Sequence, residues 1–311
     1  MKIIDLHCDT LTKLGENERA GLRINKFSVD LERLKSSSYM AQFFALFIDK
    51  EEHDAYDWAL HLADIFKYEL ANNCDLAKQA YNYMDIIEND RQGIVSCLLT
   101  IEEGAALRGS MENLKKFYDM GVRIITLTWN YPNEIGYPNC MMEHQNKGLT
   151  EFGHDLLDEM NRLGIIIDVS HLSDKGFYDV AQSSKVPFVA SHSNARSITG
   201  HPRNLTDDMI RKLAELGGIT GINFFAGFLG TEAVSTVENM VKHIRHIYNT
   251  GGSEVLALGS DFDGISSRVE FGGCSGMEVL FHNLKKNGFS ETDLDKIFYG
   301  NALRVIKDVL K

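Results

Sequence analysis

Short runs of apolar and β-branched residues recur along the chain, and each is followed by a segment with helical spacing. Eight such runs predict strands, at residues 3–9, 42–48, 93–99, 122–128, 165–169, 187–191, 218–223 and 255–260. Most of these runs are apolar throughout, which is typical of parallel strands covered on both faces. Eight strands that alternate with helices predict an α/β fold of the (β/α)8 TIM-barrel type.

The segments between the strands carry the start and stop signals of helices. Ser110 and Gly121 bound one helical segment, and Thr150 and Gly164 bound another, in the N-terminal and C-terminal positions that these residue types favour. The longest helical stretch, residues 52–90, can hold two helices. A doubly wound open sheet is the alternative arrangement, but the sequence has no GxGxxG motif after a strand to support its dinucleotide-binding form.

The size and charge of the chain narrow its organisation and its partners. The 311 residues contain only 4 prolines and no Pro/Gly/Ser-rich linker, so we expect a single barrel domain over residues 1–311. The formal net charge of −12 argues against a nucleic-acid partner, since phosphate binding needs clustered Lys and Arg.

The apolar runs and the cysteines indicate the cellular compartment of the protein. No run approaches the roughly 20 apolar residues of a transmembrane helix, and the N-terminus lacks a signal-peptide pattern, so we expect no membrane association. The 5 cysteines form no CxxC pair. An odd number of unpatterned cysteines indicates reduced thiols and a cytoplasmic location.

Ionisable side chains gather where five of the predicted strands end. They are His7 and Asp9 after the first strand, Glu102 and Glu103 after the third, His171 after the fifth, His192 after the sixth, and Asp261 and Asp263 after the eighth. The carboxyl ends of barrel strands face one shared mouth. We therefore expect these side chains to form one site.

Their chemistry suits divalent metal ions. Strand alternation puts His7 and Asp9 on one side and Cys8 on the other, so the pair can offer a nitrogen and an oxygen to one cation, and this mixture suits zinc. Five protein ligands can serve two ions if one carboxylate bridges them. The fourth strand, VRIITLTW, has no Lys to act as a bridge, which leaves a Glu of the third strand. Pattern alone does not choose between Glu102 and Glu103.

Three other kinds of catalytic machinery lack their motifs. The sequence contains no GxSxG elbow, no GxxxxGK[ST] loop and no HExxH helix. These absences argue against an α/β-hydrolase, against ATP chemistry and against a zincin protease, respectively.

The segments DLHCDT, IEEG, LTWN, IDVSH, SHSNAR with HPRN, and GSDFDG resemble the membrane (renal) dipeptidase family, the M19 metallopeptidases. Order and spacing agree from His7 to NALRV near the C-terminus. The resemblance implies a (β/α)8 barrel with two zinc ions that hydrolyses dipeptides, including those with a C-terminal D-residue, through a metal-bridging hydroxide. The family also suggests a homodimer.

The resemblance further implies a role for each residue that falls on the family pattern. The implied metal ligands are His7 and Asp9 for one ion, His171 and His192 for the other, and Glu102 as the bridge. Asp261 matches the acid/base carboxylate, and Arg203 in HPRN matches the arginine that helps to hold the substrate. We place Trp129 and Asn223 with Arg203 among the substrate-binding residues.

The chain departs from the commoner family pattern at two positions. Many members have a His in an LTH pattern where this chain has Trp129, and many have EGG where it has Glu102-Glu103-Gly104. The indole of Trp129 can either donate a hydrogen bond to the developing oxyanion or act as a wall of the pocket, and the sequence leaves both open.

Two other functions remain as alternatives. The first is another binuclear amidohydrolase, such as an N-acyl amino acid deacylase or a deaminase, although those families more often carry HxH on the first strand. The second is a non-enzymatic barrel that binds peptides. Loss of metal ligands would mark such a protein, and all five are present.

Overall fold

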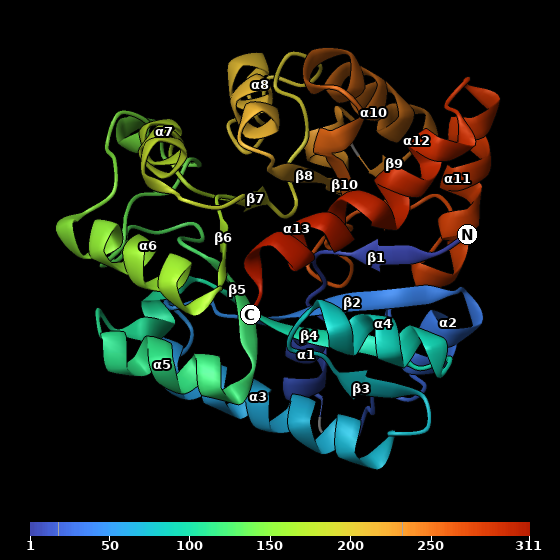
Figure 1. The fold of residues 1–311 in the computed structure, drawn as a ribbon, viewed down its shortest axis with the longest axis horizontal. Helices are drawn as coiled ribbons and strands as arrows, with labels where there is room; N and C mark the ends of the chain where they lie inside the picture. The colour runs from blue at the N-terminus through green and yellow to red at the C-terminus, as the bar shows by residue number, and fades with distance from the viewer. Residues whose placement is uncertain (18, 232) are drawn as a thin grey trace.

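The computed structural model describes residues 1–17, 19–231 and 233–311. The eight strands predicted from the sequence form a closed barrel of parallel strands (Figure 1). The barrel strands are β1 (Ile3–Asp5), β2 (Tyr39–Phe47), β4 (Val95–Glu102), β5 (Val122–Thr126), β6 (Ile166–Asp168), β7 (Val189–Ala190), β8 (Ile219–Ile222) and β10 (Leu256–Leu258). Neighbours run in the order β2-β1-β10-β8-β7-β6-β5-β4, and pairing of β2 with β4 closes the ring. The predicted (β/α)8 barrel is confirmed, and the open sheet is excluded.

Helices surround the strands as an outer layer (Figure 1). The α-helices are α1 (Thr10–Gly15), α2 (Leu31–Ser36), α3 (Ala55–Asn72), α4 (Tyr83–Arg91), α5 (Met111–Met120), α6 (Glu151–Leu163), α7 (Asp174–Ser183), α8 (Asp207–Glu215), α9 (Ala226–Leu229), α10 (Val237–Gly251), α11 (Met277–Lys286), α12 (Glu291–Asp295) and α13 (Asn301–Val309). Across the residues that the structure describes, no helix has the length and apolar character that a membrane span requires.

The helix ends confirm the local signals of the sequence. The Ser110 hydroxyl accepts a hydrogen bond from the Asn113 N–H at the start of α5, and Gly121 ends that helix with a φ of +104°. Thr150 and Gly164 play the same two roles for α6. Because a residue with a Cβ is strained at positive φ, glycine is the natural helix terminator.

The stretch at residues 52–90 holds α3 and α4 and also a strand that the sequence did not reveal. This strand, β3 (Ala77–Gln79), pairs with the first residues of β4 in the register Ala77 to Val95. It has three residues, and only the first is buried, so it carries no apolar run to detect. A second short pair, β9 (Val234–Ser235) with β11 (Arg268–Val269), lies outside the barrel.

Two layers of apolar side chains form the core. The larger layer lies between strands and helices and includes Cys8. The other fills the inside of the barrel, where Ile4, Ile166 and Ile219 pack with Val305 of α13. In Figure 1, α13 runs as a red helix across the strands. This helix closes the amino-terminal end of the barrel, so only the carboxyl ends of the strands are left to form a site.

Strands β7, β8 and β10 approach one another so closely that two positions need glycine. A Cβ built on Gly221 or on Gly259 would overlap the carbonyl oxygen of Ser191, which follows β7 directly. The constraint is steric, since neither glycine has a positive φ. Ser191 precedes the predicted ligand His192, so the packing of these strands also fixes part of the site.

We expect Gly259→Ala to destabilise the fold by about 1–3 kcal/mol, because overpacking forces the backbone apart. Gly200→Ala is the matched control, since an added Cβ there meets no atom within 4 Å, and it should change the free energy of unfolding by less than about 0.5 kcal/mol. Urea denaturation followed by circular dichroism measures both. Equal midpoints for the two variants would contradict the steric account.

Candidate metal centre and active site

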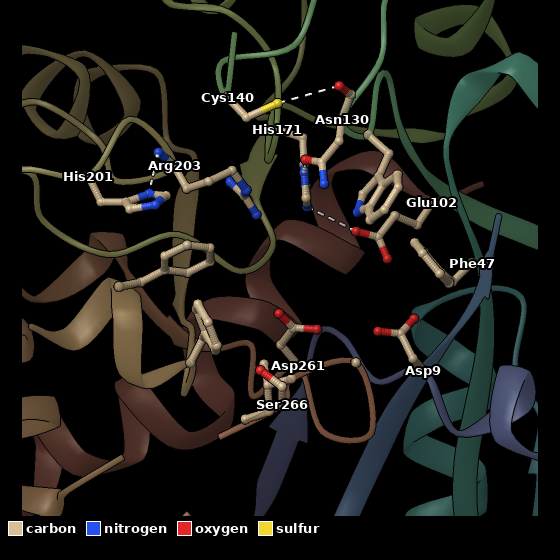
Figure 2. Close-up of a pocket in the computed structure, with 15 residues that line it drawn as sticks. Asp9, Phe47, Glu102, Asn130, Cys140, His171, His201, Arg203, Asp261 and Ser266 are labelled. Carbon is tan, nitrogen blue, oxygen red and sulfur yellow. Dashed lines mark hydrogen bonds and ion pairs between the residues drawn. The ribbon is translucent and has the colours of Figure 1, made fainter. Parts of the chain in front are cut away.

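A cavity of about 320 Å³ opens at the carboxyl ends of the strands (Figure 2). Six of the residues predicted from the sequence line it: Asp9, Glu102, Trp129, His171, Arg203 and Asp261. Its volume lies at the small end of the range for ligand pockets, about 300–1,000 Å³. The cavity therefore suits a small molecule rather than a folded chain.

The carboxylate of Glu102 lies at the centre of the ionisable groups. Glu102 ends β4 and is 3% exposed. Its Oε2 lies 3.0 Å from Nε2 of His7, while its Oε1 lies 3.0 Å from Nε2 of His171 and 3.5 Å from Nε2 of His192. Each oxygen of one carboxylate thus faces a different set of imidazoles. This is the placement of a carboxylate that can bridge two cations.

His7, Asp9 and Asp261 form a second cluster next to the first. Nε2 of His7 lies 3.6 Å from Oδ1 of Asp9, and one ligand atom from each of the three residues falls within 4.8 Å of the others. As the strand alternation predicted, Cys8 points away into the outer core.

The chemistry of these buried atoms fits metal ions. Among the described residues, Oδ1 of Asp9 makes no hydrogen bond, and neither does Nε2 of His7 although Oε2 of Glu102 lies 3.0 Å from it; both atoms are buried. Buried polar atoms are normally paired. Unpaired nitrogen and oxygen atoms that face one another within ligand distance are what a divalent cation would satisfy.

Hydrogen bonds determine which ring nitrogen of His192 carries the proton. The Ser191 hydroxyl donates to Oδ2 of Asp168 at 2.6 Å, and its oxygen lies 2.7 Å from Nδ1 of His192. Because the hydroxyl has one hydrogen, the Ser191 oxygen must accept from an N–H at Nδ1. Nε2 of His192 therefore carries the lone pair and faces Glu102, ready to bind a metal.

His171 is held in the same orientation by a different residue. Its Nδ1 lies 3.2 Å from Oδ1 of Asn130, an acceptor that requires the proton on Nδ1 and leaves the lone pair on Nε2. His171 has a φ of +69°, and Asp261 has a φ of +61°. Positive φ is strained for residues with a Cβ and is concentrated at functional sites.

Burial and neighbouring charges shift the pKa values in the site. Burial lowers the pKa of His171 and lowers the pKa of His192 to about 4, so both imidazoles are neutral near pH 7, the form that ligates metals. Burial also acts to lower the pKa of His7, but the charges of Glu102 and Asp9 raise it overall.

The pKa values of Glu102 and Asp261 shift in opposite directions. Burial acts to raise the pKa of Glu102, yet His7 and the hydrogen bonds of His171 and His192 lower it well below the ordinary value. Burial raises the pKa of Asp261, and the charge of Asp9 raises it further. Of the two, Asp261 is therefore the better carrier of a proton.

Glu103 points away from the cavity, which distinguishes it from Glu102. Its side chain is fully buried and accepts hydrogen bonds from the backbone N–H of Ala105 at 2.8 Å and of Trp129 at 3.1 Å, and from Nδ2 of Asn133. Burial raises the pKa of this carboxyl. Sequence pattern left the two glutamates equivalent, whereas the structure gives them different surroundings.

Two buried aspartates support the site, and sequence reasoning did not identify them. Asp5 accepts from the N–H of Ser260 at 2.8 Å and from its hydroxyl at 2.6 Å. Asp168 accepts from Ser191 through the same two groups at the same distances. Each serine directly precedes a site residue, Asp261 or His192. The repeated motif Ile-Ile-Asp at the ends of β1 and β6 was the signal that could have revealed them.

The three residues predicted to bind substrate lie in three different surroundings. Arg203 is 3% exposed, and its Nε, Nη1 and Nη2 have no hydrogen-bond partner within the described part of the chain. Trp129 is half-buried, with its ring 4.9 Å from that of Phe47. Asn223 lies behind Asp261, fully buried, and its Nδ2 donates to Oδ2 of Asp261 at 2.8 Å.

A closed (β/α)8 barrel with imidazoles and carboxylates gathered at its strand ends is typical of metal-dependent hydrolases. The family model for membrane dipeptidase (peptidase family M19) matches residues 1–311. The chain belongs to this family, and it is accordingly a peptide-bond hydrolase. The family implies a divalent metal, usually zinc.

Relatives from distant organisms agree with this assignment. An uncharacterized protein of the pqqA 5′ region in Klebsiella pneumoniae is 34% identical over 79% of this chain and 93% of its own. Dipeptidase 3 of Mus musculus is 30% identical over 99% of this chain, which spans 64% of the mouse protein. An uncharacterized dipeptidase of Schizosaccharomyces pombe is 31% identical over 98% of this chain and 80% of its own.

Two crystal structures share the whole fold. The dipeptidase AC, a family M19 metallo peptidase, superposes with a TM-score of 0.93 at 28% identity and covers 100% of this chain and 99% of its own. A metallo peptidase from Rhodobacter sphaeroides, liganded with a phosphinate mimic of the dipeptide L-Ala-D-Ala, has a TM-score of 0.93 at 26% identity, with 99% of both chains covered.

We expect Ser191→Ala to weaken metal binding by about 10–100-fold while the fold is kept, because the hydroxyl orients His192 and sets its tautomer. Metal titration of the chelator-treated protein by calorimetry measures this affinity. Ser197→Ala is the matched control, since the exposed Ser197 hydroxyl bonds to Asp207 instead. Equal affinities in the two variants would show that the Asp168–Ser191 pair does not act on the metal.

Proposed function

We propose that this chain is a zinc-dependent dipeptidase with two metal ions, and that its substrates include dipeptides with a C-terminal D-residue. The observation that carries the proposal is the position of Glu102, whose two oxygens face separate groups of ligands. A solved relative that binds a mimic of L-Ala-D-Ala supports the substrate class.

Five side chains would hold the ions. His7 and Asp9 would serve one ion, His171 and His192 the other, and Glu102 would bridge both. Bound ions of this kind lower the pKa of water towards neutrality and polarise the scissile carbonyl. The chain itself supplies the neutral imidazoles of His171 and His192 and the fixed distances between the ligands.

Asp261 is the proposed proton carrier. It accepts a proton from the attacking water and returns it to the amine nitrogen of the leaving residue. Asn223 holds its Oδ2 at 2.8 Å, so Oδ1 is the oxygen left for the transfer. Gly264 makes this possible, because a Cβ at that position would overlap carboxylate oxygens of Asp9 and Asp261.

Arg203 is the proposed anchor for the substrate carboxylate. A buried guanidinium without a partner is costly unless a ligand pairs with it, and its planar fork matches a carboxylate in two-point contact. In a dipeptide, the free carboxylate lies close to the scissile bond. The small cavity and this anchor together favour dipeptides over longer chains.

We expect the purified protein to hydrolyse L-Ala-L-Ala and L-Ala-D-Ala, and to lose both activities in chelator until Zn²⁺ is restored. Tri-alanine and N-acetyl-alanine are the matched comparison substrates, because they test chain length and the amidohydrolase alternative. Product amino acids are measured by chromatography. Cleavage of N-acetyl-alanine without cleavage of either dipeptide would overturn the proposed function.

We expect Asp261→Asn to lower kcat by about 10²–10⁴-fold, the usual cost of removing a general acid/base. Because Asp261 also clusters with His7 and Asp9, the metal content must be measured on the same sample. Retained metal with lost turnover supports proton transfer. Loss of an ion would instead show that Asp261 is a metal ligand. An active variant would show that another group transfers the proton.

A further inference from the structure

We propose that Phe47 and Trp129 form the subsite for the side chain of the N-terminal residue of the dipeptide, and that Glu103 is the positioning residue that holds Trp129 there. The enzyme then favours large apolar N-terminal residues over glycine and over charged residues. The inference rests on the proposed function, since the contact of Arg203 with the substrate carboxylate sets the direction of the substrate.

The cavity has two distinct ends. In Figure 2, Arg203 and His201 lie on one side, Phe47 lies on the opposite side, and Glu102 and Asp261 lie between them. A dipeptide whose carboxylate reaches Arg203 places its scissile carbonyl over the central carboxylates. Its N-terminal residue then extends towards Phe47.

Strand register brings the two aromatic residues to the metal centre. Phe47 ends β2 and pairs in register with Glu102. On the other side of Glu102, its partner in β5 is Thr126, and Trp129 follows three residues later. The two strands that flank Glu102 therefore both carry an aromatic ring at the cavity.

The two rings form one apolar wall. Their centroids lie 4.9 Å apart at an interplanar angle of 75°, and Tyr131 continues the wall with its ring 5.8 Å from that of Trp129. Both Phe47 and Trp129 are half-buried and line the cavity. An apolar side chain gains by leaving water against this wall, whereas a charged side chain loses hydration there.

Glu103 fixes the position of Trp129 through the backbone. Its carboxylate accepts from the Trp129 N–H at 3.1 Å and from Nδ2 of Asn133, and Asn133 in turn accepts from the N–H of Ile135 at 2.8 Å. One buried carboxylate thus ties together the loop that follows β5. Without it, the Trp129 N–H would lose its acceptor.

The strained backbone of Glu103 indicates that its side chain has a functional role. Glu103 has a φ of +96°, which is strained for any residue except glycine. A glycine would relieve that strain but would leave the loop unattached. The strained glutamate is consistent with a wall that must stay in place next to Glu102.

Steady-state kinetics on L-Leu-L-Ala, L-Phe-L-Ala, Gly-L-Ala and L-Glu-L-Ala test the subsite directly. We expect kcat/KM to be about tenfold or more higher for Leu-Ala than for Gly-Ala, mostly through KM, since a filled apolar pocket discriminates on that scale. Trp129→Ala and Phe47→Ala should each bring the Leu-to-Gly ratio towards one. The ratio within one variant cancels any general loss of activity.

The reversed pairs L-Ala-L-Leu and L-Ala-Gly test the direction of the substrate. Trp129→Ala should leave their ratio as it is in the native chain, because the C-terminal side chain lies at the Arg203 end. If Trp129→Ala instead alters this ratio and spares the Leu-Ala to Gly-Ala ratio, the assignment of the subsite is wrong.

Tryptophan fluorescence tests Glu103 separately from turnover. The chain has 2 tryptophans, so a Trp58→Phe background leaves Trp129 as the only reporter. Trp58 stacks on His53 with ring centroids 4.1 Å apart. Trp58→Phe therefore serves as the matched control, and it should leave all substrate ratios unchanged. In this background, Glu103→Gly should shift the Trp129 emission to longer wavelength and reduce the Leu-to-Gly ratio, and Glu103→Gln should restore part of both.

The outcomes separate this inference from the proposed function. If the native protein cleaves no dipeptide, the proposed function fails. If it cleaves dipeptides but turns over Gly-Ala as efficiently as Leu-Ala, only the inference is overturned. Unchanged emission and an unchanged ratio in folded Glu103→Gly would overturn the positioning role alone.

Discussion

The arrangement of the site depends on one buried carboxylate that faces imidazoles from three other strands. Oε2 of Glu102 lies 3.0 Å from His7, and Oε1 lies 3.0 Å from His171. Nitrogen lone pairs and carboxylate oxygens held this close, with almost no solvent, are stable together only when a cation or a proton lies between them. The rest of the barrel serves to bring these atoms together and to keep them in place.

The fold meets this requirement with rigid parts on every side. Helix α13 closes the far end of the barrel, so the ligands rest on a packed core. Asp5 and Asp168 each hold a serine that precedes a site residue, which fixes the site from behind. Glu103, which directly follows β4, accepts from the Trp129 N–H and so holds the loop after β5. Glu102 ends a strand, whereas the other proposed ligands lie just past the strand ends, where these buried hydrogen bonds fix their geometry.

Sequence reasoning reached the barrel because parallel strands covered on both faces leave a strong apolar signal. It reached the ligands because barrel topology gathers the ends of distant strands at one mouth. It missed β3, which is too short and too polar to show a period. The residue pattern could not place Asn223 behind Asp261, and only the family resemblance separated Glu102 from Glu103. The direction of a side chain after a strand depends on backbone angles such as the φ of +96° at Glu103.

Crystallography at the zinc absorption edge tests directly whether Glu102 bridges two ions. Anomalous difference maps of the zinc-loaded protein should show two peaks in the cavity. We expect His7, Asp9 and Glu102 to contact one peak, and Glu102, His171 and His192 to contact the other. A single peak, or two peaks that do not share Glu102, would contradict this expectation.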